Sequence, residues 1–196
     1  MKSMAKVFMV LALVAVICLP GMALANLVVN GGFETGNFSG WTAIIAPDCT
    51  DPGSFFAWTG AAHSGSYGAF IGAYGAADSD ILMQAIPTTA GHQYNLSFWL
   101  QDDYGANGTG NPFEVSWNGG NLLTLSGVQP IGWVNYTFTG LVGTAGTSTI
   151  QFTGREVPGG WFLDDVNAVP LPPSALLMGS GLLGLLGLGW RRRKTS

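Results

Sequence analysis

The chain has 196 residues and a formal net charge of −4, but its charges are unevenly distributed. Between residues 26 and 169 a single basic residue, Arg155, stands against all eleven acidic residues, so this part carries about −10. Such a surface repels phosphate backbones, which argues against a nucleic-acid partner, and it attracts cations, of which Ca²⁺ is the first to consider.

The first 25 residues have the three parts of a secretory signal peptide. Two lysines precede an apolar run from Val7 to Leu19, and Ala23-Leu24-Ala25 forms an A-x-A cleavage site. We therefore expect export by the Sec translocon and cleavage by signal peptidase, with Asn26 as the first mature residue. The alternative is an uncleaved signal anchor or a buried helix.

Residues 26–168 are predicted to form an all-β domain, because short alternating runs are separated by Gly, Asn, Pro and Asp. An Asn118-Gly119-Gly120 turn predicts a hairpin, and Ala46–Ala62 is expected to be a long loop with one short strand. The expected fold is an antiparallel two-sheet jelly-roll sandwich. The expected strands are Leu27–Asn30, Gly40–Ile45, Phe55–Trp58, Tyr67–Gly72, Asp80–Ile86, 93–101, 113–117, 121–126, 133–140, 148–154 and 160–169.

Alternation along 93–101 predicts which side chains face the core. One face would carry Tyr94, Leu96, Phe98 and Leu100. The opposite face would carry Asn95, Ser97, Trp99 and Gln101.

Common catalytic motifs are missing from this domain. It contains no G-x-S-x-G, no H-E-x-x-H and no lysine for a P-loop. After signal cleavage Cys49 is the only cysteine, so an intrachain disulfide and a Cys/His zinc site are excluded. Three acid pairs leave open a small polysaccharide hydrolase or lyase, although solvated loop acids are the simpler interpretation of the first two pairs. The pairs are Asp78/Asp80, Asp102/Asp103 and Asp164/Asp165.

Acidic residues at the two ends of the domain are better site candidates. Glu34 follows Phe33, whose ring should anchor the first strand in the core. Asp164 and Asp165 interrupt an apolar final strand, where a period of two requires one of them to point inward. An inward carboxylate is costly unless it is paired or bound to a metal, and the domain has almost no basic residue. A hard cation is therefore the expected partner.

The opening "NGGFE…GW" and the closing hydrophobic-Asp-Asp-Val resemble carbohydrate-binding modules of the family 4/9/22 type, and more broadly galactose-binding-like jelly rolls. In such modules a structural Ca²⁺ commonly ties the first strand to the last. The resemblance implies Glu34 and Asp165 as its ligands, with Asp164 as the alternative.

The resemblance also implies aromatic platforms for sugar rings. The candidates are Trp58, Trp99, Tyr104, Trp117 and Trp133. Trp99 is favoured by alternation, because it lies on the face opposite Phe98. A tryptophan in a sandwich is nevertheless more often part of the core.

Residues 169–196 differ from the rest of the chain. An uncharged, glycine-rich span at 174–190 is barely long enough to cross a bilayer as a helix. A proline motif precedes it, Val169-Pro170-Leu171-Pro172. A basic stop follows it, Arg191, Arg192, Arg193 and Lys194, and would keep the tail cytoplasmic.

This order of parts resembles a PEP-CTERM sorting signal of Gram-negative bacteria, in a VPLP variant where Leu171 replaces the usual glutamate. The resemblance implies a transient hold at the inner membrane, cleavage by an exosortase-type enzyme near the motif, and release to the cell surface or exopolysaccharide matrix. We expect a non-catalytic matrix protein that binds carbohydrate. The alternatives are the hydrolase or lyase above, and a purely structural biofilm protein permanently anchored in the membrane.

Overall fold

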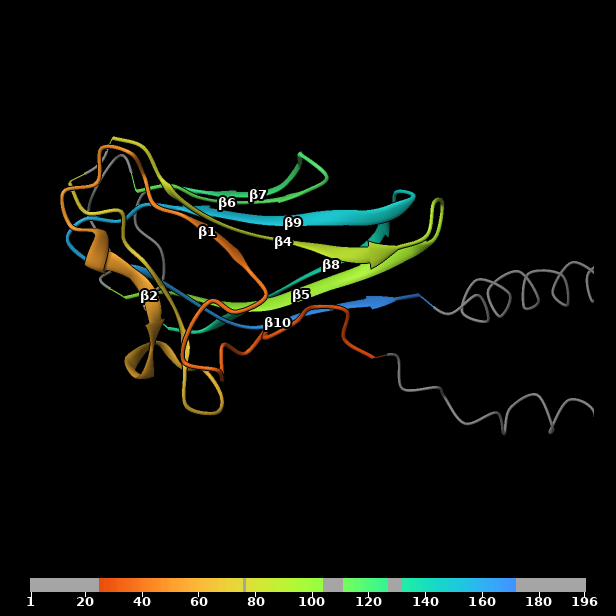
Figure 1. Cartoon of the computed structure of the whole chain (residues 1–196), viewed down its shortest axis with the longest axis horizontal. Coiled ribbons are helices and arrows are strands. Elements are labelled where there is room, and N and C mark those ends of the chain that lie inside the picture. The colour runs from red at the N-terminus through yellow and green to blue at the C-terminus, as the bar shows by residue number, and fades with distance from the viewer. Residues whose placement is uncertain (1–24, 76, 104–110, 127–131, 172–196) are drawn as a thin grey trace, which may run out of the picture.

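The computed structural model describes residues 25–75, 77–103, 111–126 and 132–171, which form a sandwich of two layers (Figure 1). Two short 3₁₀ turns, η1 (Pro52–Ser54) and η2 (Thr59–Ala61), lie on either side of the second strand. The strands are β1 (Thr42–Ile44), β2 (Phe55–Trp58), β3 (Gly68–Ile71), β4 (Asp80–Thr88), β5 (Gln93–Asp102), β6 (Phe113–Trp117), β7 (Gly120–Leu125), β8 (Val134–Val142), β9 (Gly146–Gly154) and β10 (Trp161–Pro170).

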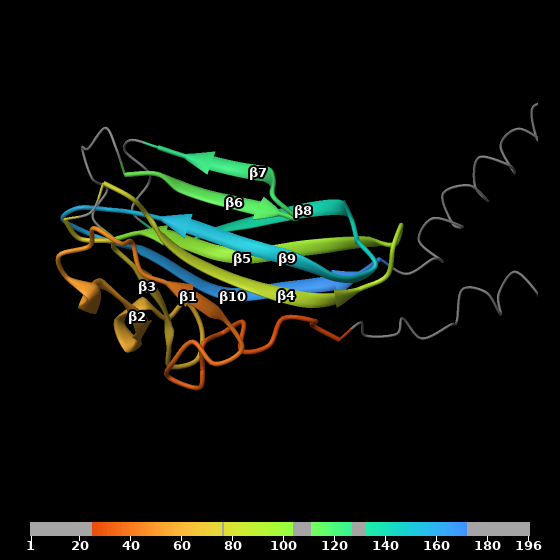
Figure 2. The same cartoon turned by 45° about the horizontal axis from the view of Figure 1, so that its top comes forward.

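Each layer is a five-stranded antiparallel sheet. The first sheet has the order β1-β4-β9-β6-β7, and the second has the order β2-β3-β10-β5-β8. Figure 2 shows the strands of the two layers running in similar directions, with β1 and β2 on one flank and β7 on the other. The predicted all-β, two-sheet antiparallel sandwich is confirmed.

The core lies between the sheets and is rich in aromatic rings. The side chains predicted to face inward on β5 are buried and alternate with half-buried ones. Phe98 packs edge-on against Phe152, with ring centroids 5.1 Å apart, and Phe152 in turn contacts Phe113. Phe33 is fully buried in the same cluster, as its sequence position predicted.

The predicted first strand at Leu27–Asn30 is wrong, because this segment turns instead of pairing as a strand. It lies along β10, where the Leu27 N–H donates to Ala168 O at 2.8 Å and the Val166 N–H donates to Gly31 O at 2.9 Å. A Cβ at Gly31 would overlap Val166 O, so only glycine allows this approach. The start of the domain is thereby held against its final strand.

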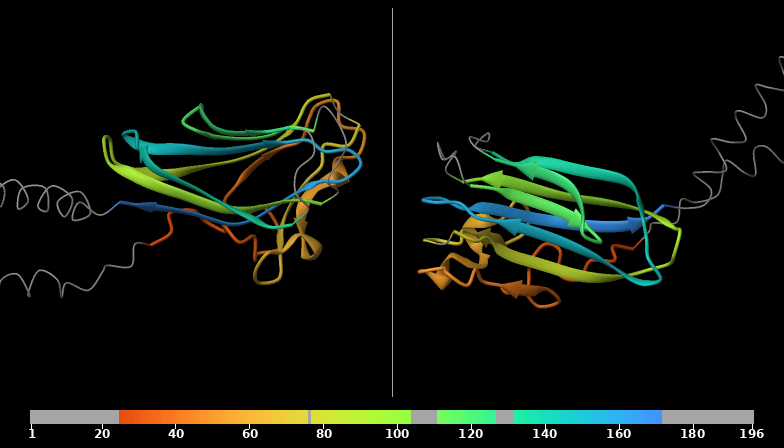
Figure 3. Two further views of the ribbon diagram at one scale, coloured as in Figure 1. Left: turned by 180° about the vertical axis from the view of Figure 1, so that it is seen from behind. Right: turned by 90° about the horizontal axis from the view of Figure 1, so that it is seen from above.

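Local turn chemistry behaves as predicted elsewhere. Asn118 and Gly119 have φ values of 52° and 77° and connect β6 to β7, as the hairpin requires. The short strand expected at Phe55–Trp58 is β2. Both ends of the described chain leave the sandwich on the same side, as the views from behind and from above show (Figure 3).

Several predicted features lie outside the described residues. These are residues 1–24 of the signal peptide, Tyr104, and the tail from Pro172 onward, including Arg191, Arg192 and Arg193. Across the part of the chain that is described, no helix has the length and apolar character needed to span a bilayer. The motif residues Val169 and Pro170 are described, and they form the last pairs of β10 with β5.

Candidate functional site

A β-bulge in β10 determines where the two adjacent carboxylates lie. Between Asp164 and Asn167 the register with β5 shifts, and Asp165 has a φ of 51°. Asp164 pairs with Trp99 and therefore shares its face, which is the outer face of the second sheet. The prediction that one of the two acids must point into the core is wrong, because the bulge breaks the period of two.

The two carboxylates hold a loop over the outer face. Asp164 Oδ2 accepts from the backbone N–H groups of His63 at 2.8 Å and Ser64 at 3.0 Å. Its Oδ1 accepts from the Asp165 N–H at 2.7 Å. Asp165 lies 2.7 Å from both the Ser64 hydroxyl, which donates to Oδ1, and the His63 ring nitrogen Nδ1. Buried Asp164 is therefore satisfied by three backbone donors rather than by a basic side chain.

Glu34 holds the other end of the same loop. Its Oε1 accepts from the N–H groups of Ser66 at 2.8 Å and Tyr67 at 3.0 Å. Gly65 lies between the two anchored halves with a φ of +64°, and a Cβ there would overlap Glu34 Oε1. Residues 63–67, which we call the clamped loop, are thus held by hydrogen bonds to three acids and by the conformation of Gly65. We call Glu34, Asp164 and Asp165 the clamp acids, and the acids and the loop together the clamp.

Burial has the largest effect on the pKa of Asp164. Asp164 has no exposed surface, and desolvation raises its pKa to about 6 against the three N–H groups, which lower it. Arg155, the only basic side chain of the predicted domain apart from histidines, donates to Ala77 O at 2.8 Å. His63 is therefore the basic group that contacts the clamp acids.

The clamp acids have donor chemistry that Ca²⁺ prefers, because carboxylate oxygens are among its usual ligands. Two of them also lie close to the same backbone position, Gly32. A Cβ added there would lie 3.8 Å from Asp164 Oδ1 and 3.9 Å from Asp165 Oδ1. Within the described ranges, no group of three or more His, Cys, Asp or Glu side chains is gathered so that it could hold a metal ion. The oxygen types fit a hard cation, while several of these oxygens bond to the clamped loop.

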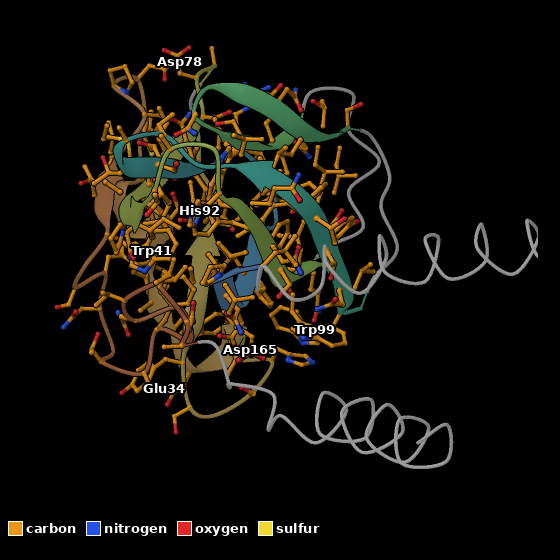
Figure 4. The ribbon with its side chains drawn as sticks, turned by 90° about the vertical axis from the view of Figure 1, so that its right-hand side faces the viewer. Glu34, Trp41, Asp78, His92, Trp99 and Asp165 are labelled. Carbon is orange, nitrogen blue, oxygen red and sulfur yellow. The ribbon has the colours of Figure 1, made fainter. Side chains whose placement is uncertain are left out.

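The clamped loop connects the acids to a field of aromatic rings. The His63 ring stacks on Trp99, with centroids 4.0 Å apart and planes 15° from parallel, and meets the edge of Trp133 at 5.2 Å. Figure 4 shows Trp99 beside Asp165, with Glu34 on the same side of the molecule. The ring contacts continue from Trp133 to Phe162 at 6.4 Å and from Phe162 to Trp58 at 5.8 Å.

These connected rings form what we call the outer aromatic face. It comprises Phe56, Trp58, His63, Phe70, Trp99, Trp133 and Phe162. Phe70 and Phe162 are buried and form its floor, whereas Phe56 and Trp58 are 38% and 42% exposed. The exposed rings therefore rest on a rigid aromatic base.

Three of the five predicted platform residues, Trp58, Trp99 and Trp133, meet on this face. Trp117 instead lies in the core, where its indole N–H donates to Val142 O at 2.8 Å. It is therefore removed from the candidate platform. Phe162 and His63 were not among the predicted platform residues. The alternation of Trp161-Phe162-Leu163 could have identified Phe162 as an outward ring, whereas the part played by His63 depends on the fold of the loop.

The other acid pairs lie apart from this site. Asp80 is fully buried and accepts from the N–H groups of Ala46 and Ala73, both at 2.9 Å. Asp102 is buried and its neighbour Asp103 is exposed. Figure 4 shows Asp78 on the side of the molecule opposite Asp165.

The first sheet carries a different kind of surface. A hollow of about 200 Å³ there is lined by Glu114, Val115, Ser116, Gly119, Asn121, Gln151 and Thr153. None of these residues supplies an aromatic ring. The exposed rings of Phe56 and Trp58 lie on the second sheet.

No protein-family model and no curated protein matches this sequence. Among solved structures, TmCBM61 in complex with β-1,4-galactotriose is 22% identical, with 75% of this chain and 99% of that chain covered and a TM-score of 0.56. The K3 cleaved adhesin domain of Lys-gingipain from Porphyromonas gingivalis is 18% identical over 74% and 99% of the two chains, with a TM-score of 0.53. A family 16 carbohydrate-binding module is 19% identical over the same shares, with a TM-score of 0.50. The described domain therefore has the jelly-roll fold that carbohydrate-binding modules adopt.

Proposed function

We propose that this protein is a non-catalytic carbohydrate-binding protein whose outer aromatic face receives a neutral glycan. The observation that carries the proposal is the meeting of Trp58, Trp99 and Trp133 on one sheet, with Trp58 exposed above a buried aromatic floor. Flat rings of this kind present apolar area at little conformational cost. The fold shared with carbohydrate-binding modules supports the same function.

The charge of the domain favours a neutral glycan over an acidic one. Residues 26–169 contain eleven acidic residues and one arginine, so their net negative charge would repel a polymer rich in uronic acids. The clamped loop would order the site before binding, because its acids fix His63 against Trp99. A preordered ring pair loses less conformational freedom when the ligand binds.

Calcium is part of this proposal. Glu34 and Asp165 would hold the ion, with Asp164 as the alternative to Asp165. When bound, the ion would supply positive charge to a clamp whose described neighbours include no lysine. The oxygen donors and their common border at Gly32 support this assignment.

Delivery to the cell surface or matrix is the remaining part of the proposal. The signal peptide would direct export through the Sec translocon, and the tail from Val169 would direct an exosortase-type enzyme at the inner membrane. Val169 and Pro170 pair with β5, and the Leu171 N–H donates to Gln93 O at 2.7 Å. Cleavage after Pro172 would therefore leave β10 complete. Mass spectrometry of the released protein should find no peptide beyond this region, and an intact C-terminus would favour a permanent membrane anchor.

Binding is tested by affinity electrophoresis of the protein through gels that contain neutral polysaccharides, including a β-1,4-galactan. The wild type should be retarded, and Trp58→Ala should remove most of that retardation. Ile44→Ala is the matched control, because Ile44 is 44% exposed on the other sheet. Free migration of the wild type in every gel, or equal retardation of Trp58→Ala, would refute the proposed binding face.

A further inference from the structure

The free edge of β8 is the longest sheet edge that the described strands leave unpaired. Of the four outermost strands, β1 has 3 residues, β2 has 4 and β7 has 6, whereas β8 has 9. Within the described ranges β8 pairs only with β5. Its other edge therefore presents backbone N–H and C=O groups that can pair with another strand.

Apart from a bulge near Gly140, this edge lacks the features that usually keep sheet edges apart. No charged residue occurs between Glu114 and Arg155, and Val134–Val142 contains no proline. Inward charges, lysines and prolines are the common means of preventing edge-to-edge pairing. In a domain that carries about −10 elsewhere, the flank formed by β7 and β8 is the uncharged part.

The same flank is incompletely covered. Several half-buried apolar side chains on its two edge strands pack against the core: Leu122, Leu123, Leu125, Tyr136, Phe138 and Leu141. Figures 2 and 3 show β7 and β8 on the same side of the sandwich, opposite β1 and β2. A strand added to β8 would cover part of this rim.

We propose that β8 pairs antiparallel with β8 of a second copy of this chain, which joins two sheets into one. The charge distribution favours a second copy of the chain as the partner, because two copies can approach through the uncharged flank without bringing their acidic surfaces together. Closed two-fold symmetry also requires only one self-complementary edge.

The side-chain pattern of β8 fixes a register centred on Thr137. A two-fold axis there places each Tyr136 opposite Phe138 of the second copy, on the inner face where both rings already contact Phe98. On the outer face Thr137 would oppose its own copy, and Asn135 would oppose Thr139. Aromatic pairs and hydroxyl pairs are favourable cross-strand neighbours.

A bulge limits the paired length. The register of β5 with β8 shifts between Tyr94 and Leu96, and Gly140 has a φ of +73°. Val142 O is also taken by the Trp117 indole. Pairing about Thr137 is thus confined to Asn135–Thr139, which predicts a weak dimer that forms at high local concentration.

Oxidative cross-linking of the full chain in cells tests the register. In a chain with Cys18 and Cys49 replaced by serine, Thr137→Cys should give a disulfide-linked dimer on a non-reducing gel. Opposed residues of an antiparallel pair have Cα atoms about 4.5–5.5 Å apart, within the range of a disulfide. Thr153→Cys is the control, because Thr153 pairs on both sides within its sheet. Equal cross-linking of the two variants would overturn the register.

Charge substitutions test the association itself. Thr137→Lys should weaken dimer formation in sedimentation equilibrium of the purified full chain by roughly fivefold, because two lysines would face each other across the axis. Thr153→Lys should leave it unchanged. A mixture of Thr137→Lys and Thr137→Asp should restore the dimer, which excludes misfolding as the cause. A wild-type chain that stays monomeric at every concentration, or a mixture that does not reassociate, would overturn the proposal.

Discussion

Replacement of Gly65 by alanine tests the clamped loop. It should lower the free energy of unfolding in two ways, through the backbone conformation and through lost hydrogen bonds, and the two contributions can be measured separately. Gly65 has a φ of +64°, where an alanine costs about 1–2 kcal/mol. The new Cβ would also overlap Glu34 Oε1 and displace it from the N–H groups of Ser66 and Tyr67. These two bonds are exposed, so their loss costs about 1 kcal/mol each. The free energy of unfolding should fall by about 3–4 kcal/mol.

In the Glu34→Ala background the second contribution, the loss of the two hydrogen bonds to Glu34, is already absent. There the alanine at position 65 has no carboxylate to displace, so it should cost only the backbone term of about 1–2 kcal/mol. The difference, about 2 kcal/mol, is the coupling energy of a double-mutant cycle.

Urea denaturation followed by tryptophan fluorescence measures all four proteins under the same conditions. Near-ultraviolet circular dichroism reports the His63–Trp99 stack in the folded state, where the rings lie 4.0 Å apart. If Gly65→Ala costs the same with and without Glu34, the glutamate does not hold the loop and the clamp interpretation fails.

Other consequences concern acidity, packing and calcium. Burial raises the pKa of Asp164 to about 6, above its usual 3.8, so this acid stabilises the fold below about pH 4 and that stability is lost as pH rises through 6. The metal-free protein should lose up to about 3 kcal/mol over this window, and Asp164→Asn should flatten the fall; a Tm that rises instead would contradict the assignment. Phe152→Ala should cost about 3–5 kcal/mol of unfolding free energy because Phe152 is fully buried, whereas Phe56→Ala at an exposed ring should cost under about 1 kcal/mol. EDTA should lower the Tm of the wild type and leave Glu34→Ala unchanged; an unchanged Tm in both would remove calcium from the site.

Strand positions followed from the sequence because alternation is a local property. On β5 the buried Leu96 and Phe98 and the half-buried Trp99 lie on the faces that a period of two assigns. The hairpin at Asn118 followed for the same reason, since positive φ values are set by residue type. The strand expected at Leu27–Asn30 failed because its partner is β10, more than a hundred residues away, and side-chain bonds from Asn26 shape the approach.

The candidate site was likewise predictable from the sequence only in part. The sequence named the acids and three of the tryptophans of this face as candidates, because acidic residues with almost no basic partner and aromatic rings are visible in the sequence. It could not show that a bulge after Asp164 keeps Asp165 out of the core, or that His63 joins the acids to Trp99. Bulges, loop closure and ring stacking depend on which strands become neighbours. For this protein the sequence by itself determined the strands, the charge asymmetry and the candidate residues, whereas only the tertiary structure decided which of those residues meet.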